Sequence, residues 1–367
     1  MVNTDGLERP VRARNRALTL LAAASAMLAA TGLAPRAANA QESPVAAAQK
    51  PVESYAFGPI FTPPKGKKIA IITCGSLGIG CVFGAKGAQE AAAALGWTSS
   101  VIDGKFDPST WNTAVQQAVA GGADGVILLA VNPALIQGGL DRARAAKIPV
   151  VDVFQPKFPG APAIDGDVTS DHAAAGVTVA NWIASDSGGK AHVLILDVSE
   201  FPEVMKRNDA LAIELARVCP TCKIERQRFG AALAAQRLAP LVTAQLREHP
   251  DIGYVTGPYD ATGTFIAQGV RQAQATGKVK YVNFEGNPIG FELMKGGEQA
   301  AEMAVASPFA GWLAVDVLAR KFAGQPVPDE VSIPQRLFVA GGTLPAGDRG
   351  WDTDFDYKAA FGTVWLR

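Results

Sequence analysis

Short apolar runs alternate with amphipathic stretches along the chain from residue 67 onward. Residues 68–73 (KIAIIT) form one such run, which is typical of a parallel strand buried on both faces. The stretches between the runs have helical spacing and often begin with Pro or end with Gly. We predict strands over residues 68–73, 99–102, 125–131, 148–154, 163–168, 192–197, 224–229, 252–256 and 279–284. We predict helices over residues 82–95, 108–120, 133–146, 171–185, 202–218, 231–249 and 261–275.

This alternation stops in an irregular segment near residues 155–170 and then starts again. Alternating strands and helices predict parallel sheets flanked by helices, so the two series indicate two similar α/β lobes. In open α/β sheets, ligands bind beyond the carboxyl ends of the strands. We therefore expect a cleft between the lobes, lined by the loops that follow the strands.

The first 40 residues have the pattern of an export signal. An apolar run over residues 17–30 is shorter than the roughly 20 residues that span a bilayer, which favours a cleavable signal peptide over a membrane anchor. Ala38-Asn39-Ala40 fits the cleavage rule for small residues. The run is preceded by four arginines, Arg9, Arg12, Arg14 and Arg16. We expect a periplasmic protein that is not inserted in the membrane after cleavage.

Residues 41–65 are rich in Ala, Pro and Gln and have no regular period, so we predict a flexible leader there. The remaining chain is long enough for two domains of ordinary size. Hydrophobic residues make up 48% and charged residues 19%, which is enough apolar material for real cores. Lys+Arg and Asp+Glu both number 34, and no basic stripe occurs, so we expect no nucleic-acid partner.

The four cysteines form two local pairs, Cys74 with Cys81 and Cys219 with Cys222. In an oxidising compartment this spacing predicts two short structural disulfides. A zinc site is the alternative, but no His is near either pair in sequence. The Cys219–Cys222 spacing also resembles a redox motif; however, reactive pairs open a helix, and this pair closes one.

Motifs for catalysis, metals and cofactors are largely missing from the sequence. Gly75, Gly78 and Gly80 follow the first strand, but their spacing departs from the dinucleotide-binding fingerprint. The three histidines, His172, His192 and His249, lie in different contexts, and no two have metal-ligand spacing. Such lone residues are more often surface or capping groups. We therefore expect no enzyme activity, no metal and no cofactor.

Several blocks resemble the type I periplasmic binding proteins, particularly the ribose-binding-like branch, over roughly residues 66–337. They include KKIAIIT with GAKGAQEAAAALGW, the block GGADGVILLAVNPALIQGGLDRARAAKIPVVDVF, then HPDIGYVTGPYDATGTFIAQGVRQA, YVNFEGNPIGFELMKGG and GWLAVDVLARKFAGQPVP. The resemblance implies two doubly wound parallel-sheet lobes joined by a three-crossing hinge, near residues 168–170, 305–307 and 333–336. The N-terminal lobe would hold residues 66–169 plus 307–334. The C-terminal lobe and tail would hold residues 170–306 plus 335–367.

The ligand loops depart from those of sugar-binding relatives, which line the cleft with Asn, Asp and Arg. The family's Asp-Arg pair corresponds here to Phe154-Gln155, and its Asn corresponds to Tyr259. A sugar would leave hydroxyls unpaired at about 1–3 kcal/mol each, so we expect a small, partly apolar or aromatic solute. The ligand-binding residues we predict are Ser76, Leu77, Ile79, Phe154, Gln155, Phe201, Met205, Arg207, Tyr259, Asp260 and Glu285.

The resemblance implies a monomeric binding protein that delivers its solute to an ABC permease. A sugar-binding protein of the same family is one alternative. A ligand-sensing module for a kinase or chemoreceptor is another, and transport and sensing are not separated by the sequence. A nucleotide-dependent oxidoreductase is less favoured because the glycine spacing does not match.

Overall fold

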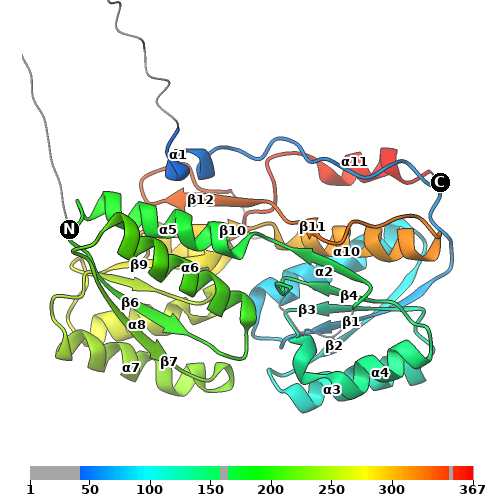
Figure 1. Cartoon of the computed structure of the whole chain (residues 1–367), viewed down its shortest axis with the longest axis horizontal. Helices are drawn as coiled ribbons and strands as arrows, with labels where there is room; N and C mark the ends of the chain where they lie inside the picture. Colours follow the sequence, from blue (N-terminus) through cyan, green and yellow to red (C-terminus); the bar gives the residue numbers. More distant parts are fainter. Residues whose placement is uncertain (1–41, 158–163, 347–349, 367) are drawn as a thin grey trace, which may run out of the picture. The chain divides into compact units, whose positions relative to one another are not determined.

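The computed structural model describes residues 42–157, 164–346 and 350–366, so the predicted signal peptide at residues 1–40 lies outside the described residues. Within the described residues the chain forms two six-stranded sheets, each with helices on both faces (Figure 1). The two α/β lobes predicted from the sequence are therefore confirmed. None of the helices in the described part combines the length and the apolar character needed to cross a bilayer.

The sheet of the N-terminal lobe is parallel throughout, with the order β11-β5-β4-β3-β1-β2. Its central strands β1 and β3 are almost entirely buried and largely apolar because helices cover both faces of the sheet. The strands are β1 (Lys68–Thr73), β2 (Thr98–Asp103), β3 (Gly125–Leu129), β4 (Val150–Val153), β5 (Gly166–Thr169) and β11 (Val331–Ser332).

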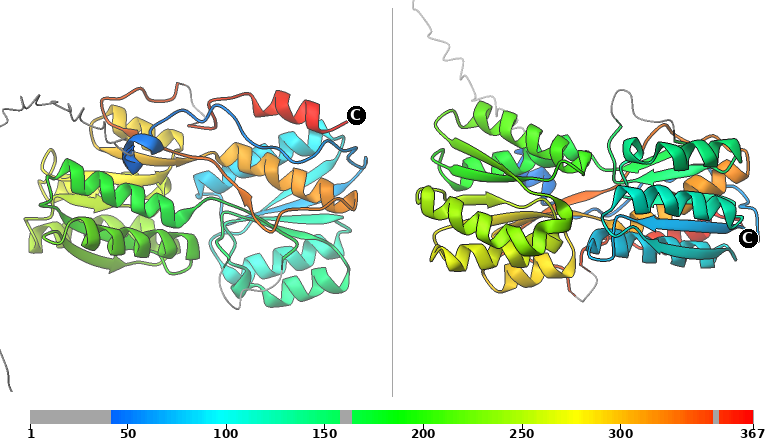
Figure 2. Two further views of the ribbon diagram at one scale, coloured as in Figure 1. Left: turned by 45° about the horizontal axis from the view of Figure 1, so that its top comes forward. Right: turned by 90° about the horizontal axis from the view of Figure 1, so that it is seen from below.

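Two pairs of helices cover this sheet, one pair on each face (Figure 2). Helices α2 and α10 pack at glycines: a Cβ on Gly311 would lie 2.1 Å from the carbonyl oxygen of Gly84. Pro108 begins a helix whose cap is Asp107, which accepts a hydrogen bond from Thr110 N. The helices are α2 (Ile79–Ala94), α3 (Pro108–Ala120), α4 (Gln137–Ala145) and α10 (Ser307–Phe322), with a 3₁₀ turn, η1 (Pro133–Leu135).

The sheet of the C-terminal lobe has the order β12-β10-β9-β8-β6-β7. Its strands are parallel except for β12, which runs antiparallel to β10 at the edge. The strands are β6 (His192–Asp197), β7 (Lys223–Arg228), β8 (Tyr254–Thr256), β9 (Lys280–Glu285), β10 (Ala301–Val305) and β12 (Gln335–Val339).

Helices α5 and α6 cover one face of this second sheet, and α7, α8 and α9 cover the other (Figure 2). Gly176 allows α5 and α6 to approach closely, since a Cβ there would lie 2.2 Å from the carbonyl oxygen of Arg207. The helices are α5 (His172–Asp186), α6 (Pro202–Val218), α7 (Ala234–Glu248), α8 (Gly263–Gln272) and α9 (Pro288–Lys295), with 3₁₀ turns η2 (Ala231–Leu233) and η3 (Asp260–Thr262).

The chain passes between the two sheets three times. The passages lie between β5 and α5, between β10 and α10, and between β11 and β12. Residues 170–171, 306 and 333–334 connect these elements, so each passage is only one or two residues long. This arrangement is the three-crossing hinge that the resemblance implied.

The two ends of the described chain depart from the sequence expectations, because they pack together as a structured pair. We call residues 42–64 and 350–366 the terminal strap. It contains α1 (Pro44–Ala48) and α11 (Tyr357–Val364), and Phe61 bridges to Trp365. The leader was expected to be flexible, but apolar burial fixes it: Phe61 is 6% exposed and Trp365 is 1% exposed. The sequence pattern gave no sign of this because the aromatic residues are irregularly spaced.

The C-terminal tail was expected with the C-terminal lobe, but α11 packs on the N-terminal lobe. Trp365 stacks on Trp312 of α10, with ring centroids 5.5 Å apart. Lys358 of α11 pairs with Glu90 of α2 at 2.5 Å. The cause is a cluster of aromatic rings, shared by the strap and α10, that excludes water from both.

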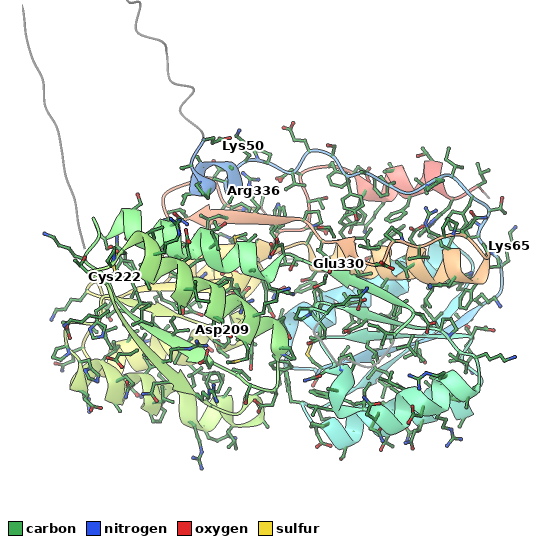
Figure 3. All side chains as sticks on the ribbon, viewed as in Figure 1. Lys50, Lys65, Asp209, Cys222, Glu330 and Arg336 are labelled. Atoms are coloured by element: carbon green, nitrogen blue, oxygen red, sulfur yellow. A yellow bond between two sulfur atoms is a disulfide. The ribbon has the colours of Figure 1, made fainter. Side chains whose placement is uncertain are left out.

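The terminal strap also contacts the C-terminal lobe. Arg336 of β12 donates to Gln49 O at 3.1 Å and to Asp354 Oδ1 at 2.7 Å. Figure 3 labels Arg336 where it lies beneath α1. Trp351 N donates to Gly286 O, 2.8 Å away, in the loop that follows β9. The strap therefore spans both lobes in addition to the three crossings.

Candidate functional site

Two small adjoining cavities lie where the carboxyl ends of the strands in the two lobes face each other. They offer about 50 and 40 Å³ to the centres of water molecules. One water needs roughly 10–15 Å³ of such space, so each cavity holds about three or four. Both are lined by Cys81, Ala130, Glu203, Arg207 and Glu285.

A larger hollow of about 450 Å³ lies elsewhere in the N-terminal lobe. Its lining includes Ile148, Pro149 and Val150, at the amino end of β4. Ligand sites of α/β sheets lie at the other end of the strands. The two smaller cavities therefore form the candidate site, although the hollow is larger.

Several of the residues that line the cavities have left-handed backbone conformations. Ala130, Phe154 and Glu285, with φ of 50°, 77° and 108°, stand at or just after the ends of β3, β4 and β9. Phe106, which follows β2, has φ of 52°. Non-glycine residues adopt such angles rarely and at an energetic cost, and such strain is concentrated at functional sites.

Hydrogen bonds hold the strained turn at Phe154 in place. Phe154 N donates to Val168 O at 2.8 Å, and the Nε2 atom of His172 lies 2.6 Å from Phe154 O. Burial, and then the positive charge of Arg207, lowers the pKa of His172 to about 3. His172 is therefore neutral at neutral pH and buried, whereas the sequence predicted a surface or capping residue.

Glu203 and Arg207 enter the site from the first turns of α6. Pro202 begins this helix, and the spacing of four residues places both side chains on one face. Burial raises the pKa of Glu203 to about 7, against the opposing influence of Arg207. Gln155 lies close enough to lower this pKa slightly, but neither of its amide atoms makes a hydrogen bond of good geometry within the described residues.

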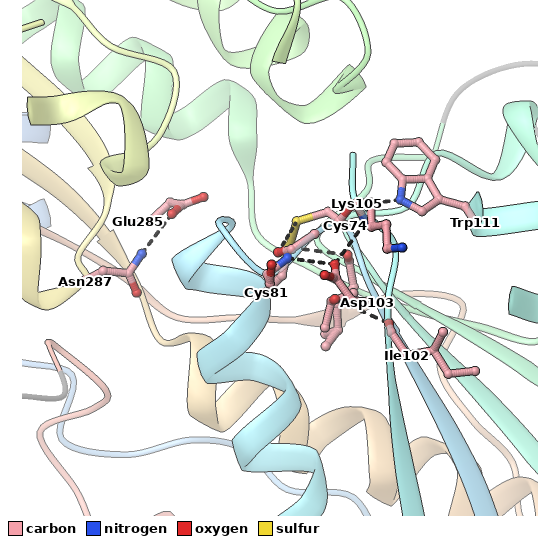
Figure 4. The surroundings of a disulfide bond; sticks show 12 residues. Cys74, Cys81, Ile102, Asp103, Lys105, Trp111, Glu285 and Asn287 are labelled. Carbon is pink, nitrogen blue, oxygen red and sulfur yellow. Dashed lines mark hydrogen bonds between the residues drawn. A yellow bond between two sulfur atoms is a disulfide. The ribbon is translucent and has the colours of Figure 1, made fainter. Parts of the chain in front are cut away.

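Glu285 enters from the opposite side, at the end of β9. Burial raises its pKa to about 8, Arg207 lowers it, and the charges of Glu302 and Glu203 raise it. Asn287 Nδ2 donates to Glu285 Oε2 at 2.8 Å (Figure 4). Gly80, at the start of α2, lies against this carboxylate, and its backbone N–H slightly lowers the pKa of Glu285. A group from the C-terminal lobe thus faces the N-terminal lobe.

Arg207 is the only Lys or Arg that lines either cavity in the described part of the chain. Its guanidinium stacks on the ring of Phe284, 3.7 Å from the centroid, and its Nη2 donates to Pro258 O. Burial lowers the pKa of Arg207 to about 10, so it stays positively charged at neutral pH. Its Nε atom is buried and has no hydrogen-bond partner among the described residues.

A buried acidic pair, Asp260 and Glu302, lies behind the site. Asn287 N donates to Asp260 Oδ2 at 2.6 Å, and Gly286 N donates to Glu302 Oε1 at 2.7 Å. Burial, and then the charge of Glu302, raises the pKa of Asp260 well above its usual range. The pair fixes the loop that carries Glu285.

Aromatic rings join the two lobes beside the charged groups. Phe106 of the N-terminal lobe meets Phe201 edge to face, with centroids 6.1 Å apart. Phe201 meets Tyr259 in the same manner at 5.8 Å. All three line the second cavity. The site therefore combines apolar ring surfaces with buried charges.

The structure brings together part of the ligand-binding set predicted from the sequence. Phe154, Phe201, Arg207, Tyr259 and Glu285 line the cavities. Gln155 is buried beside Glu203, and Asp260 lies behind the site.

Six of the predicted residues lie outside the cavity linings: Gln155 and Asp260, which are buried next to the site, and also Ser76, Leu77, Ile79 and Met205. Leu77 is 73% exposed, and Ser76 N is bound by Asp103 Oδ1 at 2.9 Å. In this loop, Gly80 at the start of α2 is the residue that faces Glu285, whereas Ser76 and Leu77 are exposed.

Sequence reasoning missed Glu203, Ser170, His172 and Phe106, which also line the cavities. Glu203 had a readable signal, since it lies in the first helical turn after a buried strand and four residues before Arg207. The others had none, because their positions depend on how the two lobes meet.

The Cys74–Cys81 pair borders both the loop and the site (Figure 4). The Cα atoms of this pair are 6.3 Å apart, and those of Cys219 and Cys222 are 5.3 Å apart. Trp111 Nε1 and Phe106 N both donate to Cys74 O, at 2.9 and 2.7 Å. The loop is thus fixed from several sides.

Solved structures with this fold include several ABC transporter binding proteins. An ABC sugar transporter subunit from Rhodobacter sphaeroides is 23% identical, with a TM-score of 0.68, and the match covers 76% of this chain and 99% of that one. A solute-binding protein from Agrobacterium vitis with bound allitol is 24% identical, with a TM-score of 0.69 and coverage of 76% and 96%. One from Burkholderia graminis in complex with D-arabinose is 20% identical, with a TM-score of 0.69 and coverage of 76% and 97%.

The chain also matches a family model over much of its length. A search of curated proteins finds no match. The model of the periplasmic binding protein domain matches residues 81–326, which include the strands and helices that carry Glu203, Arg207 and Glu285. The solved structures show the same fold. The chain therefore belongs to the family with the periplasmic binding protein domain.

Proposed function

We propose that this protein is the solute-binding component of an ABC importer, which binds a small solute between its lobes and delivers it to an ABC permease. The observation that carries this proposal is the cavity pair, closed by groups from both lobes. Glu285 and Arg207 come from one lobe and Gly80 and Phe154 from the other. A solute in contact with both lobes would favour the closed state, as in hinge-type closure.

The solute in this proposal is small and partly apolar or aromatic. Phe106, Phe154, Phe201 and Tyr259 supply ring surfaces, and Glu203, Arg207 and Glu285 supply polar contacts. Pockets of this composition orient a ligand by few polar groups and bury its apolar body. A sugar or polyol is the alternative, since structures of the same fold hold allitol and D-arabinose.

The proposal also includes export to the periplasm through cleavage after residue 40, and disulfides Cys74–Cys81 and Cys219–Cys222. The proximity of both cysteine pairs supports the disulfides, which an oxidising compartment would preserve. Mass spectrometry of the secreted protein without reducing agent tests both parts. Four free thiols would contradict the disulfides, and an N-terminus other than Gln41 would contradict the cleavage site.

A thermal-shift screen of the mature protein tests the binding function. Sugars and polyols form one set, and aromatic and alicyclic alcohols, acids and amines form the other. A ligand at about 100 times its Kd stabilises the folded state by about 2.7 kcal/mol, which raises Tm. We expect the largest shift within the second set. Uptake of that compound by cells with and without the gene then tests the importer role, and unchanged uptake would contradict it.

A further inference from the structure

We propose that the solute carries a cationic group, a protonated amine or a quaternary ammonium, held between Glu203 and Glu285. This inference rests on the proposed function, because it concerns the solute of the same site. It names the charge of that solute, which neither the family nor the fold determines. Three observations carry it: the charges that line the cavities, the contacts of Arg207, and the aromatic faces.

The first observation is an excess of acidic groups around the cavities. Among the described residues, the ionisable side chains that line them include two carboxyls, Glu203 and Glu285, and one guanidinium, Arg207. His172 also lines one cavity and is neutral, because burial and Arg207 lower its pKa to about 3. Tyr259 is neutral as well, because burial raises its pKa.

More acidic groups face these two carboxyls from behind. Glu302 and Asp260 lie next to Glu285, and Asp152 of β4 is buried close enough to Glu203 for the two to influence each other. No other Lys or Arg acts on either carboxyl among the described residues. Burial raises the pKa of Asp152 and Asp260 well above the usual range, so they add acidic groups more than fixed negative charge. A bound cation favours the ionised form of all these carboxyls and a bound anion opposes it, so the surroundings favour an added positive charge over an added negative one.

The second observation is that acidic groups surround Arg207. Its guanidinium lies flat on Phe284 and its Nη2 donates to Pro258 O, while its Nε has no partner among the described residues. The charges of Glu203, Glu285 and Glu302 all act on it. An anionic solute would have to compete with these carboxylates for one guanidinium, which disfavours a carboxylate or phosphate as the ligand.

The third observation is the aromatic lining beside the carboxyls. Phe106, Phe201 and Tyr259 meet edge to face in the cavity that Glu203 and Glu285 also line. The face of an aromatic ring attracts a cation, and rings combined with carboxylates are suited to ammonium groups that carry methyl or methylene carbons.

Binding of a cation should release protons from the site. In the free protein, burial raises the pKa of Glu203 to about 7 and that of Glu285 to about 8, so both are partly protonated at neutral pH. A bound cation stabilises the ionised carboxylates and lowers both pKa values. Affinity for a cation should therefore rise as the pH rises from about 6 to about 8.5, while affinity for a neutral solute should not.

Matched pairs of compounds test the charge directly by isothermal titration calorimetry. The pairs are choline with 3,3-dimethyl-1-butanol, benzylamine with benzyl alcohol, and glucosamine with glucose, and benzoate serves as the anion. We expect the cationic member of at least one pair to bind about 10-fold or more tightly than its neutral partner. Titration in buffers of different ionisation enthalpy should show proton release.

Variants of the two carboxyls assign the effect to this site. Glu285→Gln and Glu203→Gln should each weaken binding of the cation about 10-fold or more and leave the neutral partner nearly unchanged. The exposed Glu248→Gln is the control and should change neither. Circular dichroism checks that each variant folds, and a variant that unfolds is replaced by Glu285→Asp, which keeps the charge and shifts its position.

The possible outcomes separate this inference from the proposed function. Tighter binding of a neutral member, of glucose or of another sugar would overturn the charge assignment and leave the proposed function intact. Tight binding of benzoate would overturn it as well. Binding by no compound of any class, in this panel and in the thermal-shift screen, would count against the proposed function itself.

Discussion

At the residue scale, Tyr259 connects the aromatic lining of the site to its charged groups. Its ring meets Phe201 edge to face and lines the cavity that Arg207 and Glu285 share. We expect Tyr259→Ala to weaken solute binding about 10-fold or more, because it removes ring surface from a buried site. Titration of the best compound measures this loss. Tyr259→Phe keeps the ring and should bind nearly as well; equal losses in both variants would contradict a packing role.

Glu285 should reduce the stability of the folded protein as the pH rises. Its pKa is raised from an ordinary 4.5 to about 8, so between these values the unfolded chain loses a proton that the folded protein keeps. The folded state is therefore disfavoured progressively as the pH rises from 4.5 to 8. We expect Glu285→Gln to gain up to a few kcal/mol over wild type near pH 8 and much less near pH 5.

Urea unfolding of both proteins at these two pH values measures the difference. His172 contributes the opposite slope, since its pKa is lowered to about 3 and the unfolded chain binds the extra proton below about pH 6.5. Wild type and Glu285→Gln share this contribution, so it cancels in the comparison. A difference that does not depend on pH would contradict the assignment to Glu285.

The residues of the candidate site differ in how well the sequence predicts them. Phe154, Phe201, Arg207, Tyr259 and Glu285 were predicted from the resemblance to the family's ligand positions, and most of them stand at or shortly after the carboxyl end of a strand. Ser170 and Phe106 were not, since their position in the site depends on contact between the lobes. At the start of α2, Gly80 faces Glu285, one position after the predicted Ile79, and Leu77 is exposed.

At the scale of elements, a glycine at a close contact between two helices helps to position the side chains of the site. Gly176 lets α5 approach the carbonyl oxygen of Arg207, where a Cβ would lie 2.2 Å away. We expect Gly176→Ala to lower the free energy of unfolding by about 1–3 kcal/mol, because the backbone must move to admit the methyl group.

The matched control for this change is Gly362→Ala. Gly362 also lies within a helix, α11, but a Cβ there would meet no atom within 4 Å. The control should be neutral or gain up to about 1 kcal/mol from helix propensity. Thermal or urea unfolding compares the two variants, and equal effects would show that the helix contact does not matter.

The elements themselves were largely predictable. Buried strands such as β1 and β6 have continuous apolar centres, and helices such as α3 and α6 begin at Pro. The expected helix over residues 133–146 is divided into η1 and α4, because Ile136 leaves the helical conformation at φ −130° and ψ 34°. Its apolar spacing carries no sign of that break.

At the scale of the whole molecule, Asp354 joins the two segments of the terminal strap to each other and to the C-terminal lobe. It accepts from Val52 N at 2.8 Å and from Arg336 Nη1 at 2.7 Å. We expect Asp354→Ala to loosen the strap, so that amide hydrogen exchange rises in residues 51–55 and in the loop around Gly286, which Trp351 holds.

Asp356→Ala is the matched control for this experiment. Asp356 lies two residues away, but its side chain caps α11 by accepting from Ala359 N at 3.0 Å. Its loss should raise exchange only in α11. Hydrogen-exchange mass spectrometry of the intact protein reports both regions; unchanged exchange around Gly286 in Asp354→Ala would show that the strap does not restrain the site loop.

The terminal strap is also the part of the fold that the sequence pattern predicted least well. The partners of Val52 and Tyr55 lie 302 and 277 residues away, and no periodic pattern links such distant segments. By contrast, each lobe is built largely from neighbouring strand-helix units, whose patterns are local. Fold class was therefore accessible from the sequence, whereas the path of the two ends was not.

The strap has a consequence for the order in which the chain can be completed. Phe61 N donates to Val364 O, and Leu366 N donates to Phe61 O, so the first described segment pairs with the last described one. During synthesis, Phe61 has no β partner until residues 364–366 have been made. Until then, α11 cannot cover the aromatic side chains of Phe57 and Phe61. An export pathway that carries unfolded chains would receive this chain before the terminal strap has formed.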